Sequence, residues 1–390
     1  QNTCSMIPVG GEPARSGCES CNECADTRFL AGWRVWERGV DYGMTSRLSS
    51  VVRACPTLEM PLDVPMGRRW RDVPDSVVAL GRALLDSVLA EIPRSLGPLA
   101  DLVRLRTGGR FHDEAQAVAT RFGVRWRDVV RAAVSYGLTI ATIGCSTLAL
   151  ATADGPVLAR NLDWWPEGLL ARTSFRIVCT SGQQTKYMMS GWPGSLGVVT
   201  GMAPGRFAFA INAVSSPEER VSPRGYPVLL HLRRVLEDAK DFDAALRSFA
   251  ETRLAAPCLL TLVGVENHQR VVVERTPRRH ALRQPPGPDA PLYATNDYHA
   301  LDRSSGALDQ RLIGTSCSRF DALTRLLAQV DPRQSIGNER LLEILSHPAV
   351  IQEITAQHVI ARPADGDLRV ELAGLSDVRA GVCGPELSGG

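Results

Sequence analysis

Residues 143–165 constrain this chain more than any other stretch, because they read as a β-hairpin that carries three chemically active side chains. Two runs of alternating apolar residues lie on either side of the pair Asp154-Gly155, which favours a chain reversal. The first run contains Cys145, and the second contains Arg160 and Asp163. The hairpin therefore predicts that a thiol, a guanidinium group and a carboxylate lie beside one another.

These three groups suggest a nucleophilic thiol that lacks a histidine base. Arg160 supplies the cation that lowers a thiol pKa, but the hairpin contains no histidine to accept the proton. Cleavage of the Gly144–Cys145 bond would free an α-amino group with a pKa of roughly 7.7–8.0, which can serve as the base. Asp163 would then hold that amine by a charge-assisted hydrogen bond. This is the chemistry of an N-terminal nucleophile (Ntn) hydrolase.

The same spacing has a plainer interpretation, which the hairpin alone leaves open. Free cysteines are among the most buried residues, and surface ion pairs are common and weak. Cys145 could thus begin a core strand, with Arg160 and Asp163 forming a surface pair after the turn. Features elsewhere in the chain are needed to distinguish a catalytic thiol from a buried structural cysteine.

Length and composition narrow the class of protein. With 390 residues, 44% of them hydrophobic, the chain can bury the core of one large or two modest domains. The formal net charge of +2 gives no nucleic-acid signal, so no nucleic-acid partner is predicted. No apolar run approaches the roughly 20 residues that span a bilayer. The first residue is Gln1, so the compartment, cytoplasmic or exported, stays open.

Cysteines crowd the beginning of the chain. Cys18, Cys21 and Cys24 have the spacing of a metal knuckle, but no fourth ligand follows at a matching interval. A flexible thiol-rich tail, or a disulfide with Cys4 or Cys55, explains the spacing without a metal. We predict no metal and no cofactor.

Periodicity divides the chain into three parts: a Cys-rich, flexible tail (1–27), a mostly helical region (28–144) and a region of mixed strands and helices (145–390). In the helical region, Asp75 or Ser76 is expected to cap a helix that follows Pro74. The apolar spacing of residues 77–105 predicts helices packed on a core, with contact to lipid or an acyl chain as the alternative. Further helices are expected at 112–122 and 126–138.

After the hairpin, strands and helices alternate in blocks, which fits a layered α+β sandwich. Strands are expected at 175–179, 197–201, 207–212, 258–265 and 270–275, helices at 226–239, 242–254, from Cys317 and at 338–345, and a closing hairpin at 356–361 and 368–372.

Several short motifs, in this order, resemble those of the acid ceramidase and N-acylethanolamine-hydrolysing acid amidase family, relatives of choloylglycine hydrolase. The resemblance runs from about Leu58 to Leu372. The matching pieces are Leu62-Asp63-Val64-Pro65 with Arg69-Trp70, Phe122-Gly123-Val124 through Tyr136, Cys145-Ser146-Thr147 with Arg160-Asn161-Leu162-Asp163, Thr200 to Phe207, Leu254-Ala255-Ala256-Pro257, and Thr295-Asn296-Asp297-Tyr298.

The resemblance implies an Ntn-type αββα sandwich, made as a precursor and cut ahead of Cys145 into an α-subunit-like and a β-subunit-like part. It also implies hydrolysis of fatty-acyl amides or related conjugates through a thioester. Cys145 would be the nucleophile and its amine the base, with Arg160 and Asp163 orienting both. Asn212 and Asn296 match amides that line the oxyanion hole. The family's late arginine matches Arg319, with Arg311 as second choice.

This chain departs from the family at three places. The turn between Cys145 and Arg160 is slightly shorter, which a hairpin can absorb. Ala213 stands where acid ceramidases carry a glutamate. Residues 1–27 and the proline-rich loop before Leu292 have no counterpart in the family.

Some of these residues also have structural interpretations. Asn212 can be a satisfied amide within an apolar strand, and Asn296 can cap a turn. Trp164-Trp165 is either a wall of the substrate pocket or part of the core. His112 and His299 are interpreted as structural.

We therefore predict an autoprocessing cysteine amidase that acts on a small N-acyl amide with an apolar acyl group. Two alternatives remain: an N-acyltransferase, in which an amine resolves the thioester, and a non-catalytic binding protein of the same fold. The sequence leaves the oligomeric state open.

Overall fold

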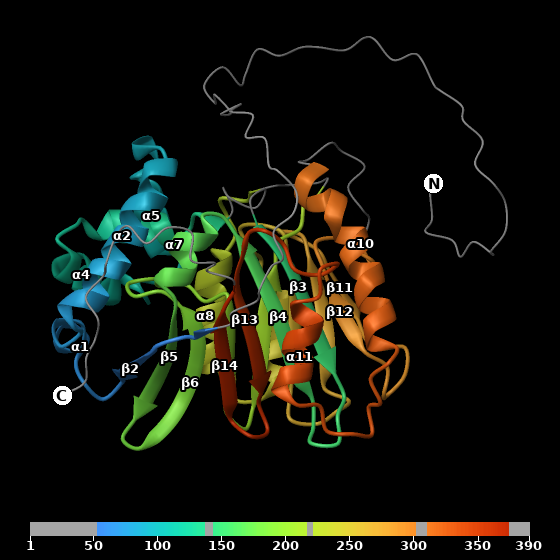
Figure 1. Cartoon of the computed structure of the whole chain (residues 1–390). Helices are drawn as coiled ribbons and strands as arrows, with labels where there is room; N and C mark the ends of the chain where they lie inside the picture. The colour runs from blue at the N-terminus through green and yellow to red at the C-terminus, as the bar shows by residue number, and fades with distance from the viewer. Residues whose placement is uncertain (1–52, 137–142, 217–220, 302–309, 374–390) are drawn as a thin grey trace, which may run out of the picture. The chain divides into compact units, whose positions relative to one another are not determined.

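The computed structural model describes residues 53–136, 143–216, 221–301 and 310–373 (Figure 1). All of them belong to one compact unit, residues 48–390. The cysteine-rich start of the chain, with Cys4, Cys18, Cys21 and Cys24, lies outside the described residues. Among the described residues, Cys55 has no disulfide partner.

The first sheet has six strands and contains the hairpin of Cys145. Its order is β1-β14-β13-β4-β3-β12, with all neighbours antiparallel. The turn between β3 and β4 contains Gly155, whose φ of 97° suits glycine. The strands are β1 (Arg53–Ala54), β3 (Ile143–Leu150), β4 (Val157–Trp164), β12 (Leu292–Ala294), β13 (Thr355–Arg362) and β14 (Asp367–Leu372).

The second sheet has eight strands in the order β11-β10-β9-β8-β7-β6-β5-β2. Only β2 and β5 pair in parallel; the other neighbours in this sheet are antiparallel. The strands are β2 (Thr57–Pro61), β5 (Phe175–Ser181), β6 (Gln184–Gly191), β7 (Thr200–Ala203), β8 (Phe207–Asn212), β9 (Cys258–Val263), β10 (Arg270–Arg275) and β11 (His280–Arg283).

The two sheets stack between two layers of helices, and the burial of β3 on both faces follows from this. Ala149 faces the second sheet, whereas Leu148 and Leu150 face α10 (Gln310–Leu327) and α11 (Asn338–Leu345). On the far side, α8 (Val228–Asp238) and α9 (Phe242–Glu251) cover the second sheet. This order of layers confirms the predicted α+β class with an αββα sandwich.

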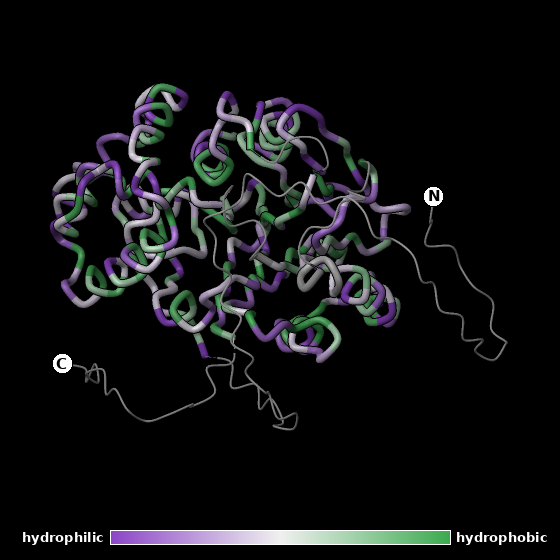
Figure 2. Tube along the Cα trace, turned by 90° about the horizontal axis from the view of Figure 1, so that it is seen from above, coloured by the Kyte–Doolittle hydropathy of each residue, from purple (hydrophilic) through white to green (hydrophobic). Residues whose placement is uncertain are grey.

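The helices that precede Cys145 gather at one side of the sandwich in Figure 1. They are α1 (Met66–Arg71), α2 (Asp75–Glu91), α3 (Leu99–Arg106), α4 (His112–Phe122) and α5 (Trp126–Ala133). Their apolar side chains join the core that contains the helix-facing side of the second sheet. Figure 2 shows hydrophilic and hydrophobic residues alternating around the helices, as amphipathic packing requires. None of the helices within the described ranges is long and apolar enough to cross a membrane.

Some expected elements need correction. Pro74 precedes the first residue of α2 and no side chain caps that helix; Asp75 instead accepts a hydrogen bond from Arg121. Helix α10 begins at Gln310 rather than at Cys317, and α5 ends at Ala133. The sequence patterns do not predict α1, α7 (Glu167–Arg172), β6, β11 or β12, and the strand expected at 197–201 starts before β7 does. Most of these are short or start with polar residues, so their periodicity is weak.

Candidate active site

The thiol of Cys145 is fully buried and lies against the guanidinium group of Arg160. Arg160 Nη2 donates to Cys145 Sγ over 2.7 Å, and Nη1 donates to Thr200 Oγ1 over 3.0 Å. The register pairs Arg160 with Thr147, so Cys145 and Arg160 are diagonal neighbours on the face of the sheet that meets the second sheet. The hairpin therefore brings the predicted thiol and cation together.

Burial and charge act in opposite directions on this thiol. Burial raises the pKa of the Cys145 thiol above its ordinary value, while the charge of Arg160 works to lower it. Among groups on the helix-covered side, Arg319 lowers the thiol pKa further and Asp163 raises it. The thiolate thus depends on Arg160 as its nearest cation.

The backbone of Cys145 is held at both its nitrogen and its carbonyl oxygen. Cys145 N donates to Asn296 Oδ1 over 3.1 Å, and Arg319 Nη1 donates to Cys145 O over 2.6 Å. Arg319 Nη2 also donates to Asn296 Oδ1 over 2.7 Å, which closes the ring of contacts. Arg319 therefore lies in the site, whereas the side chain of Arg311 lies outside the described residues.

Asp163 approaches the site from the other face of the sheet. It pairs with Gly144, so its carboxylate lies on the side opposite the Cys145 thiol and next to the Gly144–Cys145 peptide. Its Oδ1 accepts from Thr355 Oγ1 over 2.6 Å, and its buried Oδ2 has no hydrogen-bond partner among the described residues. Burial raises the pKa of Asp163, opposed by Arg319. An unpaired buried carboxylate oxygen is costly unless a cation satisfies it.

Asn212 occupies a different environment from the one expected of an oxyanion-hole amide. Its Nδ2 donates to the carbonyl oxygens of Ala294 and Thr295, over 3.1 and 2.9 Å, and its Oδ1 accepts from Thr147 Oγ1. Two carbonyls can only accept, which fixes the orientation of the amide and uses both of its N–H bonds. Asn212 therefore holds the segment ahead of Asn296 in this structure, and its role at the oxyanion stays a prediction.

Asn296 keeps an amide hydrogen that can serve an oxyanion. Its Nδ2 donates to the carbonyl oxygen of Ala213 over 2.7 Å, which occupies one of its two N–H bonds. Ser316 Oγ accepts from the backbone nitrogen of Asn296 over 2.9 Å. Ala213, the residue that replaces the family's glutamate, thus contributes its backbone to the site.

The two tryptophans after the hairpin do not meet at one surface. Trp164 packs edge-on against Trp192 with the ring centroids 5.8 Å apart, whereas the side chain of Trp165 is 53% exposed. Neither is among the residues that line the apolar pocket at helix α3, so their predicted contact with substrate stays a prediction.

An apolar pocket of about 80 Å³ lies between α3, the end of α5 and residues 221–229. Leu102, Val103 and Leu229 line it, and Tyr136 stands in its wall. Tyr136 is buried in the same cluster as Cys145, and its pKa is raised by burial first and by the Cys258 and Cys145 thiols next. Tyr136 therefore stands in the pocket wall and within electrostatic range of the Cys145 thiol. Periodicity alone gave no sign of this role, because Tyr136 looked like one more apolar residue of a helix.

Among the described residues, no group of three or more histidine, cysteine or acidic side chains is placed to hold a metal ion. The αββα sandwich and a cysteine held at its thiol, nitrogen and carbonyl place this molecule in the class of Ntn-type proteins. The contacts of the site are centred on Cys145.

A comparison with family models identifies the family within this class. The model of the acyl-coenzyme A:6-aminopenicillanic acid acyl-transferase family matches residues 150–350, just over half of the chain and starting after Cys145. The chain belongs to this family.

Curated relatives confirm the resemblance inferred from the motifs. The chain is 24% identical over 237 residues to an N-acylethanolamine-hydrolyzing acid amidase of Caenorhabditis elegans and 22% identical over 248 residues to that of Mus musculus. These alignments cover 56% and 58% of this chain and 66% of each relative, so the chain spans just under two thirds of their length.

Two solved structures are similar in part. A C. elegans N-acylethanolamine-hydrolyzing acid amidase ortholog is 19% identical with a TM-score of 0.46, covering 56% of this chain and 93% of that one. A conjugated bile acid hydrolase of Clostridium perfringens, solved as a mutant, is 14% identical with a TM-score of 0.36, covering 58% of this chain and 89% of that one.

Proposed function

We propose that this protein is a cysteine amidase that cuts its own chain before Cys145 and then hydrolyses N-acyl amides through a thioester. One observation carries the proposal: a single residue has its sulfur, nitrogen and carbonyl oxygen held by three different predicted site residues. A buried structural cysteine needs no such set of partners. The cut would divide the chain into residues 1–144 and 145–390.

Self-cleavage would begin with attack of Cys145 Sγ on the carbonyl carbon of Gly144. The C–N bond breaks as the C–S bond forms, and the thiol proton passes to the departing nitrogen. Water then hydrolyses this thioester, which releases the Gly144 carboxylate and restores the thiol. The products are two chains, the second of which begins with a free α-amine.

In turnover, the α-amine would take the thiol proton while Sγ attacks the amide carbon of the substrate. The remaining N–H of Asn296 donates to the tetrahedral oxyanion, a contact worth roughly 2.7–4 kcal/mol where it has been measured by removal. The ammonium form of the base is stabilised by Asp163 Oδ2, the carboxylate oxygen that has no partner among the described residues. The ammonium returns its proton to the leaving amine, and water releases the acid.

We assign the start of the acyl chain of such a substrate to the apolar pocket, because its lining is mostly hydrocarbon and Tyr136 in its wall interacts electrostatically with the Cys145 thiol. The curated relatives are named for N-acylethanolamines, so these amides are the first substrates to test.

Adding free amines to the same assay separates hydrolysis from acyl transfer, since transfer yields new amides.

Narrowing the pocket should alter chain-length preference. We expect Leu102→Trp to raise KM for long-chain N-acylethanolamines about 10-fold and to leave short-chain substrates unchanged, since each excluded methylene costs roughly 1–3 kcal/mol. Mass-spectrometric turnover assays over a series of chain lengths measure this. Leu282→Trp, on the distant edge strand β11, is the matched control. If Leu102→Trp changed KM equally for all chain lengths of substrate, the acyl chain would not occupy this pocket.

We also propose that the mouth of this pocket rests on lipid, within the predicted contact region of residues 77–105. Leu105, which is 75% exposed, adjoins the lining residue Arg106, and Val221, which is 45% exposed, lines the pocket itself. Arg104 and Arg106 in the last turn of α3 suit anionic headgroups.

Vesicle binding tests this contact. We expect Leu105→Asp to weaken co-sedimentation with anionic phospholipid vesicles about 10-fold or more, because burying one leucine side chain is worth roughly 1.5–3 kcal/mol. Leu282→Asp should bind as the wild type does. Failure of the wild type itself to bind vesicles would refute the contact.

A further inference from the structure

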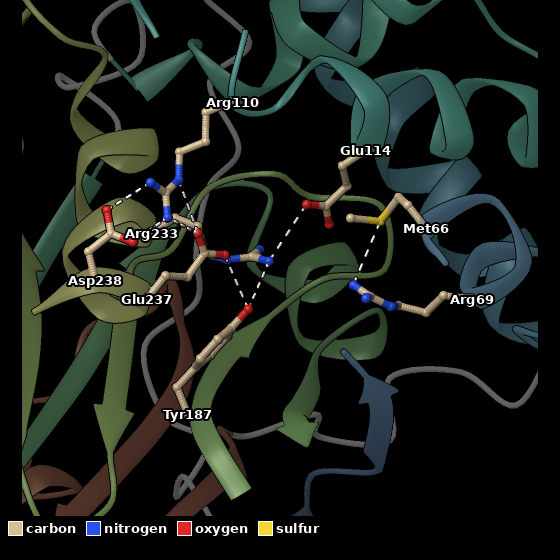
Figure 3. Close-up of polar contacts among 8 residues, drawn as sticks. All are labelled: Met66, Arg69, Arg110, Glu114, Tyr187, Arg233, Glu237 and Asp238. Carbon is tan, nitrogen blue, oxygen red and sulfur yellow. Dashed lines mark hydrogen bonds and ion pairs between the residues drawn. The ribbon is translucent and has the colours of Figure 1, made fainter. Parts of the chain in front are cut away.

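A cluster of charged residues that is buried at its centre joins Glu114 of helix α4 to Arg233 of helix α8 (Figure 3). Its centre is Arg233, a nearly fully buried residue of α8. We call the set of Arg110, Glu114, Tyr187, Arg233, Glu237 and Asp238 the Arg233 cluster.

Arg233 contacts three partners of the cluster. Its Nε lies 2.5 Å from Glu237 Oε1, and its Nη2 donates to Tyr187 Oη over 3.1 Å. Nη2 also lies 3.6 Å from Glu114 Oε2. Burial raises the pKa of Glu114, and the charge of Arg233 works against that rise.

Arg110 binds Glu237 as well, and it also binds the neighbouring Asp238. Its Nη2 donates to Glu237 Oε2 over 2.8 Å, and its Nη1 donates to Asp238 Oδ2 over 2.7 Å. Burial acts against the charge of Glu237, but Arg233 and Arg110 outweigh it and hold the pKa of Glu237 below its ordinary value.

A small internal cavity completes the polar region. It measures about 20 Å³ and is lined by Arg69, Glu114 and Arg233. Arg69 Nε is buried without a hydrogen-bond partner among the described residues. A cavity of this size holds roughly one water molecule, which can serve the orphaned donor. With Arg69 counted, three cations face three carboxylates.

The cluster crosses the proposed cleavage point. Arg69, Arg110 and Glu114 precede Gly144, whereas Tyr187, Arg233, Glu237 and Asp238 follow Cys145. Strands β1 and β2, which also precede the cut, add to the edges of the two sheets. The part before the cut therefore meets the part after it through strand pairing, apolar contact and these charges.

We propose that the Arg233 cluster is the polar surface by which residues 145–390 bind and hold the separated residues 53–136 after cleavage. This inference rests on the proposed function. Apolar surface and strand edges accept many partners, but a buried guanidinium group accepts only a surface that brings a carboxylate to the position of Glu114. The ligand is thus the first segment of this same chain.

Replacing Arg233 by methionine tests the proposal in the full chain. Removing one partner of a buried ion pair is strongly destabilising, so Arg233→Met should release the first fragment at a urea concentration roughly 1 M lower than in the wild type. Size exclusion in graded urea with mass identification measures this. Arg234→Met is the matched control, because Arg234 contacts His231, Thr252 and Tyr226, all after the cut.

Glu114→Gln provides a milder variant in case Arg233→Met does not fold. It should release the first fragment at a urea concentration between those of the wild type and Arg233→Met. If mass analysis finds the chain uncut, the proposed function fails, and hydrogen exchange of α4 then tests the cluster alone. Arg233→Met should speed that exchange at least about 10-fold relative to Arg234→Met. Equal release and equal exchange in the two arginine variants would overturn the inference.

Discussion

Replacing Cys145 by alanine is expected to leave the chain in one piece and to lower turnover of N-acyl amides by about 10⁴-fold or more. The variant removes the sulfur that attacks both the Gly144 carbonyl and the substrate. Because the chain stays uncut, the α-amine that would act as base is never formed. Intact-mass analysis and a turnover assay on the same sample measure both losses.

Cys258→Ala is the matched control for this experiment. Cys258 is fully buried in β9, and burial raises the pKa of its thiol to about 12, so it is an inert thiol of the same core. The control should be cut and should turn over substrate as the wild type does. Cleavage before residue 145 in Cys145→Ala would show that another group attacks Gly144.

Replacing Arg160 by methionine is expected to lower kcat by about 10²–10³-fold, because the charge-assisted contact to Cys145 Sγ is lost. Burial already raises the pKa of this thiol, and loss of the nearest cation raises it further. A higher thiol pKa lowers the thiolate fraction at a given pH. The pH dependence of Cys145 alkylation should therefore move to higher pH.

Arg206→Met is the control for the arginine variant. Within the described part of the chain, Arg206 donates to the backbone carbonyls of Ala239 and Lys186 and lies over the Phe207 ring, and none of these three is a predicted site residue. Its alkylation profile should match the wild type. An unchanged profile in Arg160→Met would mean that Arg160 orients the thiol without influencing its charge.

The hairpin was predictable because its signal is local. Alternating residues, a turn pair and three side chains within twenty residues define the strands, and strand pairing then brings Arg160 to Cys145. The fold class followed from the same kind of pattern together with the family motifs. Local patterns thus suffice where neighbours in sequence are neighbours in space.

Contacts between distant segments were not predictable from periodicity. Thr355, which donates to Asp163, lies on β13 and meets it only through the register of β4 and β13. The resemblance placed Asn212 in the site, but the carbonyls of Ala294 and Thr295 decide what its amide does there. The assembled sheets, rather than the sequence around each residue, set these roles.

The charged residues around Arg233 gave no signal for a similar reason. Arg110 and Glu114 look like the start of an ordinary amphipathic helix, and Arg233 and Glu237 look like an i, i+4 pair on another. Arg110 stays partly exposed, but the packing of α4 on α8 buries Glu114 and Arg233 against each other. Their burial turns common surface residues into an interface.

The proposed mechanism depends above all on a free amine on the residue that carries the attacking sulfur. Acid-quenched wild-type protein in steady-state turnover of an N-acylethanolamine, digested and mapped by mass, addresses this in one measurement. The expected result is a fragment whose first residue is Cys145, with the acyl group on its sulfur and a free α-amine. A chain that hydrolyses the substrate while the Gly144–Cys145 bond stays intact would contradict the mechanism.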